Sequence, residues 1–388
     1  MFFVMKISKL CDLRCTYCYE YEELGQRARM SLDDLAFFFK GVAEHYIEQG
    51  WRSKLHFVLH GGEPTLLPLE YFRGFVALQR QYLTTKGIPY DTSVQTNLTR
   101  TSDALVDLLE KLDIGLGVSL DVFGSQRVNS VGVNSQKRVL ENLQTLFDSG
   151  AVERLSVGAI AVLHGLNVDS AVNTFYFFND LGLSYRILPI FSLTDPVPRM
   201  RHLTLSADQV VGAMQKVALA QARCDSRIEI YPLREFLIAA VQCLSGRRGD
   251  PYDPAIMEWA LIVNTNGDAY NHSEAYASDG LLGNIFRHSL REILSSEGRK
   301  RTLRLRAERA LTCERCRYGQ CCNRIPIIEA LPSERVYDSQ NSLECRIARP
   351  MIDFMIGQIT GDPSASALIR KPTRRATRRD SLDKSLTR

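Results

Sequence analysis

Residues 3–18 have the sequence FVMKISKLCDLRCTYC, an apolar run followed by three closely spaced cysteines. The apolar run at residues 3–7 predicts a buried strand. Cys11, Cys15 and Cys18 are one ligand short of the four that a [4Fe–4S] cube takes, so one iron would stay open to bind a substrate. The alternatives are a zinc knuckle or unliganded thiols, but zinc usually takes a fourth Cys or His close by, and this loop has none.

Strand-like and helix-like segments alternate along the first part of the chain. The expected strands cover residues 3–7, 55–59, 92–95, 114–120, 155–163 and 185–190, and the expected helices cover residues 30–49, 69–83, 102–112, 136–149, 170–181 and 206–223. Six such repeats predict an α/β fold with a parallel sheet and helices outside it. They suit a partial (β/α)6 barrel, although periodicity alone also allows a doubly wound sheet.

Polar motifs follow four of these expected strands. They are the cysteine loop at residues 11–18 and the segments at residues 61–64, 95–97 and 119–121. In barrels of this kind the chemistry collects at the carboxyl ends of the strands. We therefore expect these four segments to share one site.

Composition and charge indicate an ordinary globular protein. The 388 residues are 45% hydrophobic and 24% charged, and the formal net charge is +4. Residues 370–388 hold eight Lys/Arg and two Asp, so they carry +6 and the remainder carries −2. We expect a disordered basic tail there, with no nucleic-acid partner. No apolar run approaches the roughly 20 residues of a membrane span, and no signal peptide is evident, which predicts a cytoplasmic protein without a membrane partner.

The ten cysteines gather at the two ends of the chain, which suggests metal ligands rather than a disulfide framework. Only Cys224 and Cys243 lie between the groups, and the second group consists of Cys313, Cys316, Cys321, Cys322 and Cys345.

The first cysteine group, Cys-x3-Cys-x2-Cys with Tyr17 before its last member, resembles the signature of radical S-adenosylmethionine (SAM) enzymes. The His-Gly-Gly-Glu-Pro segment at residues 60–64 resembles the motif that binds the methionyl amino group of SAM in that family. The residues that the resemblance implies as SAM contacts are Tyr17, Gly61, Gly62, Glu63, Pro64, Gln95, Asn97, Ser119, Asp121 and Arg127. The two glycines would let the backbone approach the cofactor, and Glu63 would accept hydrogen bonds from an ammonium group.

The resemblance covers most of residues 3–350 and implies two cofactors, SAM and a [4Fe–4S] cluster. An electron from a donor such as flavodoxin or ferredoxin would enter the cluster. SAM would then be cleaved to methionine and a 5′-deoxyadenosyl radical, which would take a hydrogen atom from the substrate.

The second cysteine group resembles the SPASM domain of peptide-modifying radical SAM enzymes. The resemblance implies Cys313, Cys316, Cys322 and Cys345 as the ligands of one auxiliary [4Fe–4S] cluster. A second auxiliary site of the family is incomplete, because His272 stands where the family has a cysteine. We predict that this second site is empty, the alternative being a cluster rescued by His272, Cys321 or Cys224. Otherwise Cys224 and Cys321 are expected to be idle thiols.

SPASM-type enzymes commonly modify ribosomally made precursor peptides, so a precursor peptide is the implied substrate. Residues 6–25 and 60–67 resemble maturases that join an aromatic carbon to a β-carbon and form a cyclophane. The alternatives are thioether formation and sulfatase-type formylglycine formation. Ser273 and Glu274 count against the sulfatase reaction, because those maturases usually have an Asp at the position of Ser273. A remote alternative is a non-enzymatic iron–sulfur or zinc module.

The catalytic base is least defined by the sequence. Glu235 and His272 are candidates, and His164 is weighed beside them, although a lone histidine is more often structural. The expected domains are a radical SAM barrel at residues 1–234, a SPASM-like domain at 235–350, and a helix with the basic tail at 351–388. With the cysteine motif starting at residue 11, no N-terminal winged-helix module is expected, which leaves room for a separate leader-binding protein.

Overall fold

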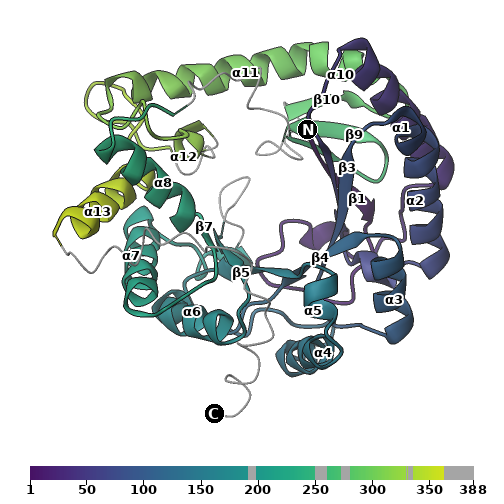
Figure 1. The fold of residues 1–388 in the computed structure, drawn as a ribbon, viewed down its shortest axis with the longest axis horizontal. Helices are drawn as coiled ribbons and strands as arrows, with labels where there is room; N and C mark the ends of the chain where they lie inside the picture. The colour runs from purple at the N-terminus through teal and green to yellow at the C-terminus, as the bar shows by residue number, and fades with distance from the viewer. Residues whose placement is uncertain (191–197, 250–259, 272–279, 329, 331–334, 362–388) are drawn as a thin grey trace. The chain divides into compact units, whose positions relative to one another are not determined.

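The computed structural model describes residues 1–190, 198–249, 260–271, 280–328, 330 and 335–361 (Figure 1). Contacts divide the chain into two compact units, each assembled from separate stretches. The first unit consists of Met1–Ser119, Arg127–Val157 and Pro254–Leu305, and the second consists of Leu120–Gln126, Gly158–Asp253 and Arg306–Arg388.

The first unit is built on a sheet whose central strands are parallel. Its strands are β1 (Phe2–Ser8), β2 (Leu55–Gly61), β3 (Tyr90–Thr96), β4 (Ile114–Ser119), β8 (Ala260–Val263), β9 (Asp268–Asn271) and β10 (Leu281–Asn284). β1 to β4 pair in sequence order and in parallel, so their carboxyl ends meet at one edge. β8 pairs in parallel with the other side of β1, and β9 and β10 continue the sheet in the antiparallel sense.

Helices cover this sheet as the alternation of segments predicts. They are α1 (Leu32–Glu48), α2 (Leu69–Tyr82), α3 (Asp103–Lys111), α4 (Gln136–Asp148), α5 (Ala151–Arg154) and α10 (Leu290–Ser295). Figure 1 shows α1, α2 and α3 along the same side of the strands. Ser31 begins α1, since its side chain accepts a hydrogen bond from the amide of Asp34 at 3.0 Å. The apolar face of α1 then packs on the sheet, with Phe38 edge-on to Phe3 at 5.2 Å.

The second unit repeats the strand–helix pattern. Its elements are β5 (Gly158–Leu163), β6 (Tyr185–Pro189), β7 (Ile230–Tyr231), α6 (Ala171–Asp180), α7 (Ala207–Arg223), α8 (Leu233–Leu244), α12 (Ile325–Ile328) and α13 (Ala348–Gly361). β5, β6 and β7 are parallel. α11 (Glu297–Ala310) contributes residues to both units. The six predicted strands and six predicted helices are all present, which confirms the α/β fold.

Two details differ from the sequence analysis. The fifth strand begins at Gly158 rather than at residue 155, because α5 and the turn that follows it occupy the preceding residues. Residues 260–263, predicted to lie in a separate second domain, instead share a sheet with β1. β8 thereby supplies hydrogen-bond partners to a strand edge that would otherwise be open. The domain boundary after residue 234 stays a prediction.

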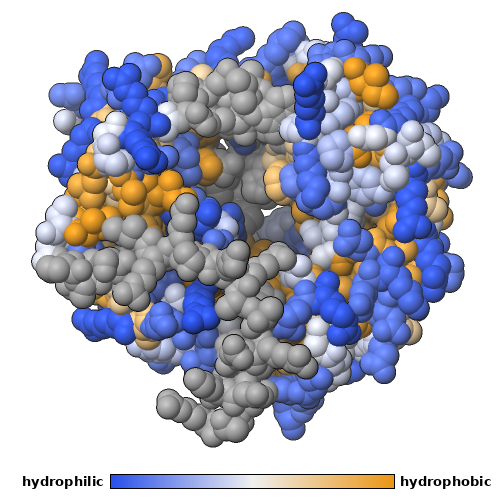
Figure 2. All heavy atoms as spheres, in the orientation of Figure 1, coloured by the Kyte–Doolittle hydropathy of each residue, from blue (hydrophilic) through white to orange (hydrophobic). Residues whose placement is uncertain are grey.

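Figure 2 shows hydrophilic residues over much of the visible face, with apolar residues in separate patches. In the part of the chain that the structure describes, no helix is both long and apolar enough to cross a membrane.

Candidate functional site

The cysteine loop follows β1 and is organised by Arg14. The guanidinium of Arg14 donates hydrogen bonds to the carbonyl oxygens of Cys11 at 2.8 Å, Leu13 at 2.7 Å and Leu24 at 3.2 Å. The amide of Cys18 donates to the carbonyl of Cys15 at 3.0 Å. A single side chain therefore fixes the path of the backbone around the first two cysteines.

The raised pKa values of two thiols in this loop mean that metal binding would release protons from them. Burial raises the pKa of Cys11 to about 12, and the nearby carboxylates of Glu63 and Asp12 act in the same direction. Burial also raises the pKa of Cys18 to about 11. Both are neutral thiols in the metal-free chain at pH 7, so the binding of iron must displace their protons. Three half-buried cysteines on one short loop fit the predicted cluster.

Asp12 ties the loop to the end of β3. Its carboxylate accepts hydrogen bonds from the side-chain amide of Asn97 at 2.8 Å and from the hydroxyl of Thr99 at 2.6 Å. The same amide nitrogen of Asn97 lies 3.8 Å from the Cys11 sulfur. Asn97, predicted as a SAM contact, thus also positions the cysteine loop.

Gly61 and Gly62 are required by the loop's own backbone. The amide of Gly62 donates to the carbonyl of Ser8 at 2.8 Å, and the amide of Glu63 donates to the carbonyl of Leu10 at 2.7 Å. A Cβ on Gly61, whose φ is +127°, would lie 2.1 Å from the Ser8 oxygen. A Cβ on Gly62 would lie 2.3 Å from the Leu10 oxygen. Both positions therefore require glycine because the backbone that leads into the cysteines passes too close for a side chain. The sequence did not predict this role, which is separate from contact with the cofactor.

Glu63 is a buried carboxylate that joins β2 to β3. Its Oε1 atom accepts hydrogen bonds from the amide and hydroxyl of Thr65 at 3.0 and 2.7 Å and from the hydroxyl of Thr96 at 2.8 Å. Its Oε2 atom accepts one from the amide of Asn97 at 2.6 Å. Burial raises its pKa. A carboxylate has about four acceptor positions, and these four hydrogen bonds occupy all of them. The described contacts therefore explain Glu63 as the link between the ends of β2 and β3. Pro64 occupies the first position of the short helix Pro64–Leu66, where no amide proton is needed.

Gln95 and Ser119 meet across the ends of β3 and β4. The side-chain amide of Gln95 donates to the Ser119 hydroxyl at 2.8 Å. Gly117 makes room for it, since a Cβ there would lie 2.3 Å from the Gln95 oxygen. The two predicted SAM contacts are therefore placed side by side by a glycine that sequence reasoning missed.

Tyr17 and Arg127, predicted as separate SAM contacts, bind each other. The guanidinium of Arg127 donates to the Tyr17 hydroxyl at 3.0 Å. The adjoining backbone supports this contact, because the amide of Arg14 donates to the carbonyl of Val128 at 2.6 Å. The segment after β4 therefore packs on the cysteine loop within the first unit.

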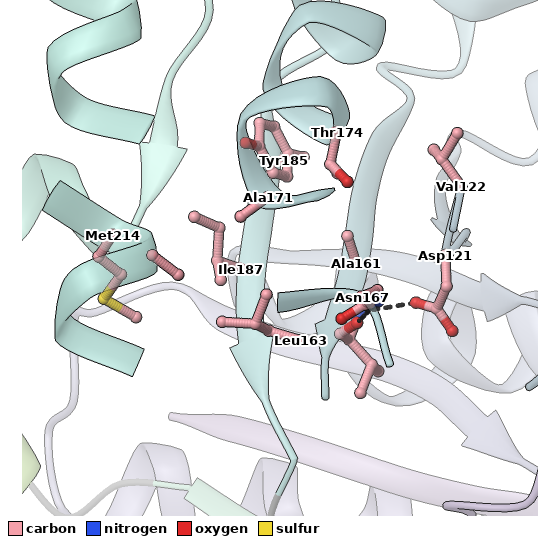
Figure 3. Close-up of a pocket in the computed structure, with 12 residues that line it drawn as sticks. Asp121, Val122, Ala161, Leu163, Asn167, Ala171, Thr174, Tyr185, Ile187 and Met214 are labelled. Atoms are coloured by element: carbon pink, nitrogen blue, oxygen red, sulfur yellow. Dashed lines mark hydrogen bonds between the residues drawn. The ribbon is translucent and has the colours of Figure 1, made fainter. Parts of the chain in front are cut away.

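Asp121 belongs to the second unit, where it borders a small pocket (Figure 3). Its carboxylate accepts a hydrogen bond from the amide of Val162 at 2.7 Å. The cavity beside it, about 20 Å³, also has Asn167, Thr174 and Tyr185 among its lining residues. That volume suits a single water molecule rather than a cofactor.

Comparison with known proteins identifies the domain that contains the first cysteine group. Residues 5–178 match the model of the Radical SAM superfamily. This chain carries a radical SAM domain. The chain is therefore an enzyme whose cofactors are SAM and a [4Fe–4S] cluster, which confirms the resemblance seen in the cysteine spacing and removes the alternative of a passive metal-binding module.

Several relatives found in sequence are sulfatase-maturating enzymes. The serine-type anaerobic sulfatase-maturating enzyme of Bacteroides thetaiotaomicron is 23% identical over 344 residues, which are 82% of this chain and 80% of that protein. The serine-type enzyme of Klebsiella aerogenes is 31% identical over 117 residues, 30% of this chain and 28% of that protein.

Solved structures share the fold. Native anSMEcpe with bound AdoMet and Cp18Cys peptide matches with a TM-score of 0.74 at 16% identity, covering 95% of this chain and 99% of that chain. SuiB of Streptococcus suis bound to S-adenosylmethionine matches with a TM-score of 0.58 at 13% identity, covering 83% and 72%. These matches confirm the radical SAM α/β fold.

The second cysteine group lies in the second unit, outside the residues that match the radical SAM model. Cys313 is buried, its pKa is raised by burial to about 12, and Cys345, Cys322 and Cys316 all act on it electrostatically. Gly319 closes the turn between them, because a Cβ there would lie 2.1 Å from the Cys313 oxygen. These four thiols, one buried and three half-buried, fit the ligand set of an auxiliary cluster.

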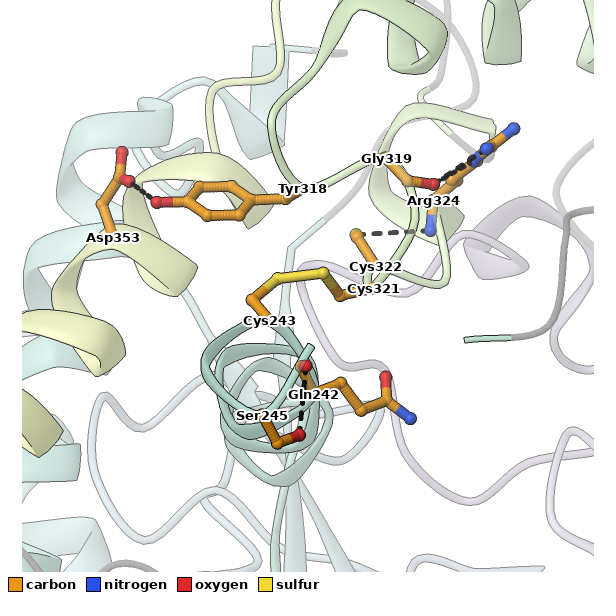
Figure 4. The surroundings of a disulfide bond; sticks show 9 residues. All are labelled: Gln242, Cys243, Ser245, Tyr318, Gly319, Cys321, Cys322, Arg324 and Asp353. Carbon is orange, nitrogen blue, oxygen red and sulfur yellow. Dashed lines mark hydrogen bonds between the residues drawn. A yellow bond between two sulfur atoms is a disulfide. The ribbon is translucent and has the colours of Figure 1, made fainter. Parts of the chain in front are cut away.

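Cys243 and Cys321 form a disulfide, with their Cα atoms 5.6 Å apart (Figure 4). The expectation of an idle Cys321 was therefore wrong, while a single disulfide does not make a disulfide framework. The amide of Gly249 donates to the carbonyl of Gln320 at 2.7 Å, which holds the end of α8 against the cysteine turn. While it is intact, this disulfide withholds Cys321 from a second auxiliary cluster, whose absence stays a prediction.

The candidate bases are resolved only in part. Glu235 lies in the first turn of α8, and its Oε2 atom is buried with no hydrogen-bond partner among the described residues. His272 lies outside the described residues. His164 is buried, its amide donates to the side-chain oxygen of Asn167 at 2.8 Å, and a Cβ on Gly124 would lie 2.4 Å from its ring. Packing therefore accounts for His164.

His164 predicts a pH dependence of stability. Burial, with His202 nearby, lowers its pKa to about 4, below the ordinary value of 6.5. Between those values the unfolded chain binds a proton that the folded chain does not, so stability falls as the pH drops from 6.5 toward 4. We expect up to about 1.4 kcal/mol of lost unfolding free energy per pH unit from this group. Urea unfolding at pH 7, 6 and 5 should show a shallower slope for His164→Gln than for wild type, and equal slopes would contradict the assignment.

Asp12, Thr99 and Arg14 are residues that sequence reasoning missed. Their hydrogen bonds join segments more than 80 residues apart or link to backbone carbonyls, as with the pair of Asp12 and Thr99. Asp12 and Arg14 could have been suspected from their position between the first two cysteines. A metal-binding loop usually needs hydrogen bonds that orient its ligands, and these two side chains provide them.

Proposed function

We propose that this chain is a radical SAM peptide maturase that forms a side-chain cross-link, with an aromatic carbon joined to a β-carbon in a cyclophane. The observation that carries the proposal is a second cysteine group, Cys313, Cys316, Cys322 and Cys345, which the chain has in addition to the three cysteines of the radical SAM loop. A cross-link removes two hydrogen atoms from a peptide, and an auxiliary cluster provides a place for the electron left on the product radical.

The residues of this chain would then have distinct tasks. Bound SAM on the cluster supplies the radical that removes a hydrogen atom. Glu63 holds the end of β2 to the end of β3 through its four hydrogen bonds, and it would receive the amino group of SAM in exchange for one of them. Gln95 and Ser119 present paired polar groups at the ends of β3 and β4. Tyr17, held by Arg127, offers a fixed ring beside the cysteines.

A second candidate is sulfatase-type oxidation of a Ser or Cys to formylglycine. It is supported by the activity of the B. thetaiotaomicron relative, a serine-type anaerobic sulfatase-maturating enzyme that aligns with 82% of this chain. Ser273 and Glu274 weigh against it, because the sulfatase maturases usually carry an Asp directly after the cysteine that is replaced by His272 here. The partners in either case are a peptide or protein substrate and an electron donor such as flavodoxin or ferredoxin. A separate leader-binding protein would serve only the maturase.

The test is a mass-spectrometric product assay under anaerobic conditions with SAM and dithionite. The substrates are a small protein encoded beside this gene, with repeated aromatic residues near its C-terminus, and a sulfatase peptide containing Ser or Cys. The proposal predicts that the first substrate loses two hydrogen atoms, resists fragmentation across the linked residues and does not react with a hydrazide. A hydrazide-reactive product from the second substrate would support the sulfatase reaction instead. 5′-Deoxyadenosine formation without a change in either substrate would contradict both.

A further inference from the structure

Lys6 is a charged residue in the middle of the apolar strand β1. Its side chain is 0% exposed, and its strand neighbours Met5 and Ile7 are buried as well. A lone ammonium in such a place costs several kcal/mol, so it persists only with close partners. The partners of Lys6 indicate what the charge does.

All described partners of Lys6 lie beside the last cysteine or on β2. Its Nζ atom lies 2.8 Å from the Glu20 carboxylate and 3.3 Å from Nδ1 of His60, and it contacts the Tyr19 hydroxyl. It also stands 4.6 Å from the centre of the Tyr19 ring. Tyr19 and Glu20 follow Cys18 directly, and Lys6 precedes Cys11 on the strand. The contacts therefore join the two ends of the cysteine loop.

Lys9 adds a second buried cation to this network. Its Nζ atom lies 3.4 Å from the other Glu20 oxygen and contacts Glu23, while its backbone amide donates to the carbonyl of Ala28 at 3.0 Å. Lys9 and Glu20 are 3% exposed, whereas the Glu23 side chain is 45% exposed. Two buried cations thus face one buried and one half-exposed carboxylate, so the formal charges balance, and a neutral residue in place of Lys6 would leave an unpaired negative charge beneath the loop.

A positive charge in this position acts on whatever the cysteines bind. Lys6 is among the groups that act electrostatically on Cys18. A [4Fe–4S] cluster gains one negative charge on reduction, and its potential depends on nearby charge. In a poorly hydrated interior a neighbouring cation favours the reduced state more than it would in water.

We propose that Lys6 is a positioning residue of the radical SAM domain, which closes the cysteine loop through Glu20 and Tyr19 and raises the reduction potential of the cluster held there. The inference depends on the radical SAM domain and not on which peptide the enzyme modifies. It concerns residues outside the predicted SAM contacts and outside the cysteine ligands.

The test uses the reconstituted full-length chain and three variants. Lys6→Met removes the charge and keeps most of the side-chain volume. Glu20→Gln keeps the Lys6 cation but removes the carboxylate that pairs with it. Lys54→Met is the matched control, because Lys54 also forms an ion pair, with Asp91 at 3.2 Å, but is 52% exposed. The two readouts are an EPR-monitored redox titration of the cluster without peptide, and hydrogen exchange of the amides at residues 19–24.

Lys6→Met should shift the reduction equilibrium at least tenfold toward the oxidised cluster, which is about 59 mV for one electron. Its amides at residues 19–24 should exchange at least tenfold faster. Glu20→Gln should exchange faster without the negative shift in potential, and Lys54→Met should match wild type in both measurements. Wild-type exchange together with a wild-type potential in Lys6→Met would overturn the inference. If Lys6→Met does not fold, Glu20→Gln decides, and wild-type exchange in that variant would overturn it.

Discussion

The Cys15→Ala variant is expected to form no 5′-deoxyadenosine above background when it is supplied with SAM and dithionite. Cys15 is the middle cysteine of the radical SAM loop, and its carbonyl receives the amide of Cys18. With two thiols left, the loop cannot hold a cluster that presents an open iron to SAM. We expect a loss of at least about 1,000-fold, as for the removal of an essential catalytic centre. Chromatography of anaerobic reactions measures the product.

The matched control for that experiment is Cys224→Ala. Cys224 is a free, half-buried cysteine at the end of α7, outside both proposed ligand sets. Its variant should cleave SAM and bind iron like wild type. Retained SAM cleavage in Cys15→Ala would contradict the assignment of the loop, and lost iron in Cys224→Ala would favour a rescued second auxiliary cluster.

Gly61→Ala is expected to destabilise the fold by about 4 kcal/mol or more, at the upper end of what single substitutions do. The new Cβ would lie 2.1 Å from the Ser8 carbonyl oxygen, which accepts the amide of Gly62. The positive φ of +127° adds backbone strain for any other residue. Because Ser8 leads directly into the cysteine loop, iron uptake should fall together with stability. Urea unfolding and iron analysis of the purified chain measure both effects.

Gly41→Ala provides the control on the same kind of change. Gly41 lies inside α1, and a Cβ there would meet nothing within 4 Å. This variant should be more stable than wild type by about 0.5–1 kcal/mol, since alanine loses less backbone entropy in a helix. Equal stability of Gly61→Ala and Gly41→Ala would mean that the close approach of β2 to the loop does not constrain the chain.

The fold could be predicted from the sequence because the patterns that define its helices and strands are local. Ser31 with Asp34 three residues later predicts the start of α1, and alternating apolar segments predict six of the strands and six of the helices in the described structure. The cysteine spacing was sufficient for the radical SAM assignment. Each of these features is decided within about one turn or one strand of the chain.

Features that depend on distant contacts could not be predicted. The pairing of β8 with β1 joins residues about 260 positions apart along the chain and has no local signature. Adjacent cysteines gave no sign that Cys321 would pair with Cys243 while Cys322 stays free. Gly61 and Gly62 were assigned to the cofactor, but their closest neighbours are carbonyl oxygens of the loop. In the sequence, Lys6 is recognisable as a charged residue within an apolar run, which is unusual for a buried strand. Its partners could be identified only from the fold.

The most direct test of the account is the iron and acid-labile sulfide content of the anaerobically reconstituted chain, measured for wild type and for the Cys11/Cys15/Cys18→Ala variant. A radical SAM cluster and one auxiliary cluster predict about eight irons in wild type and about four in the variant. About twelve irons in wild type would contradict the empty second auxiliary site, and zinc in place of iron would contradict the account of the cysteines as a whole.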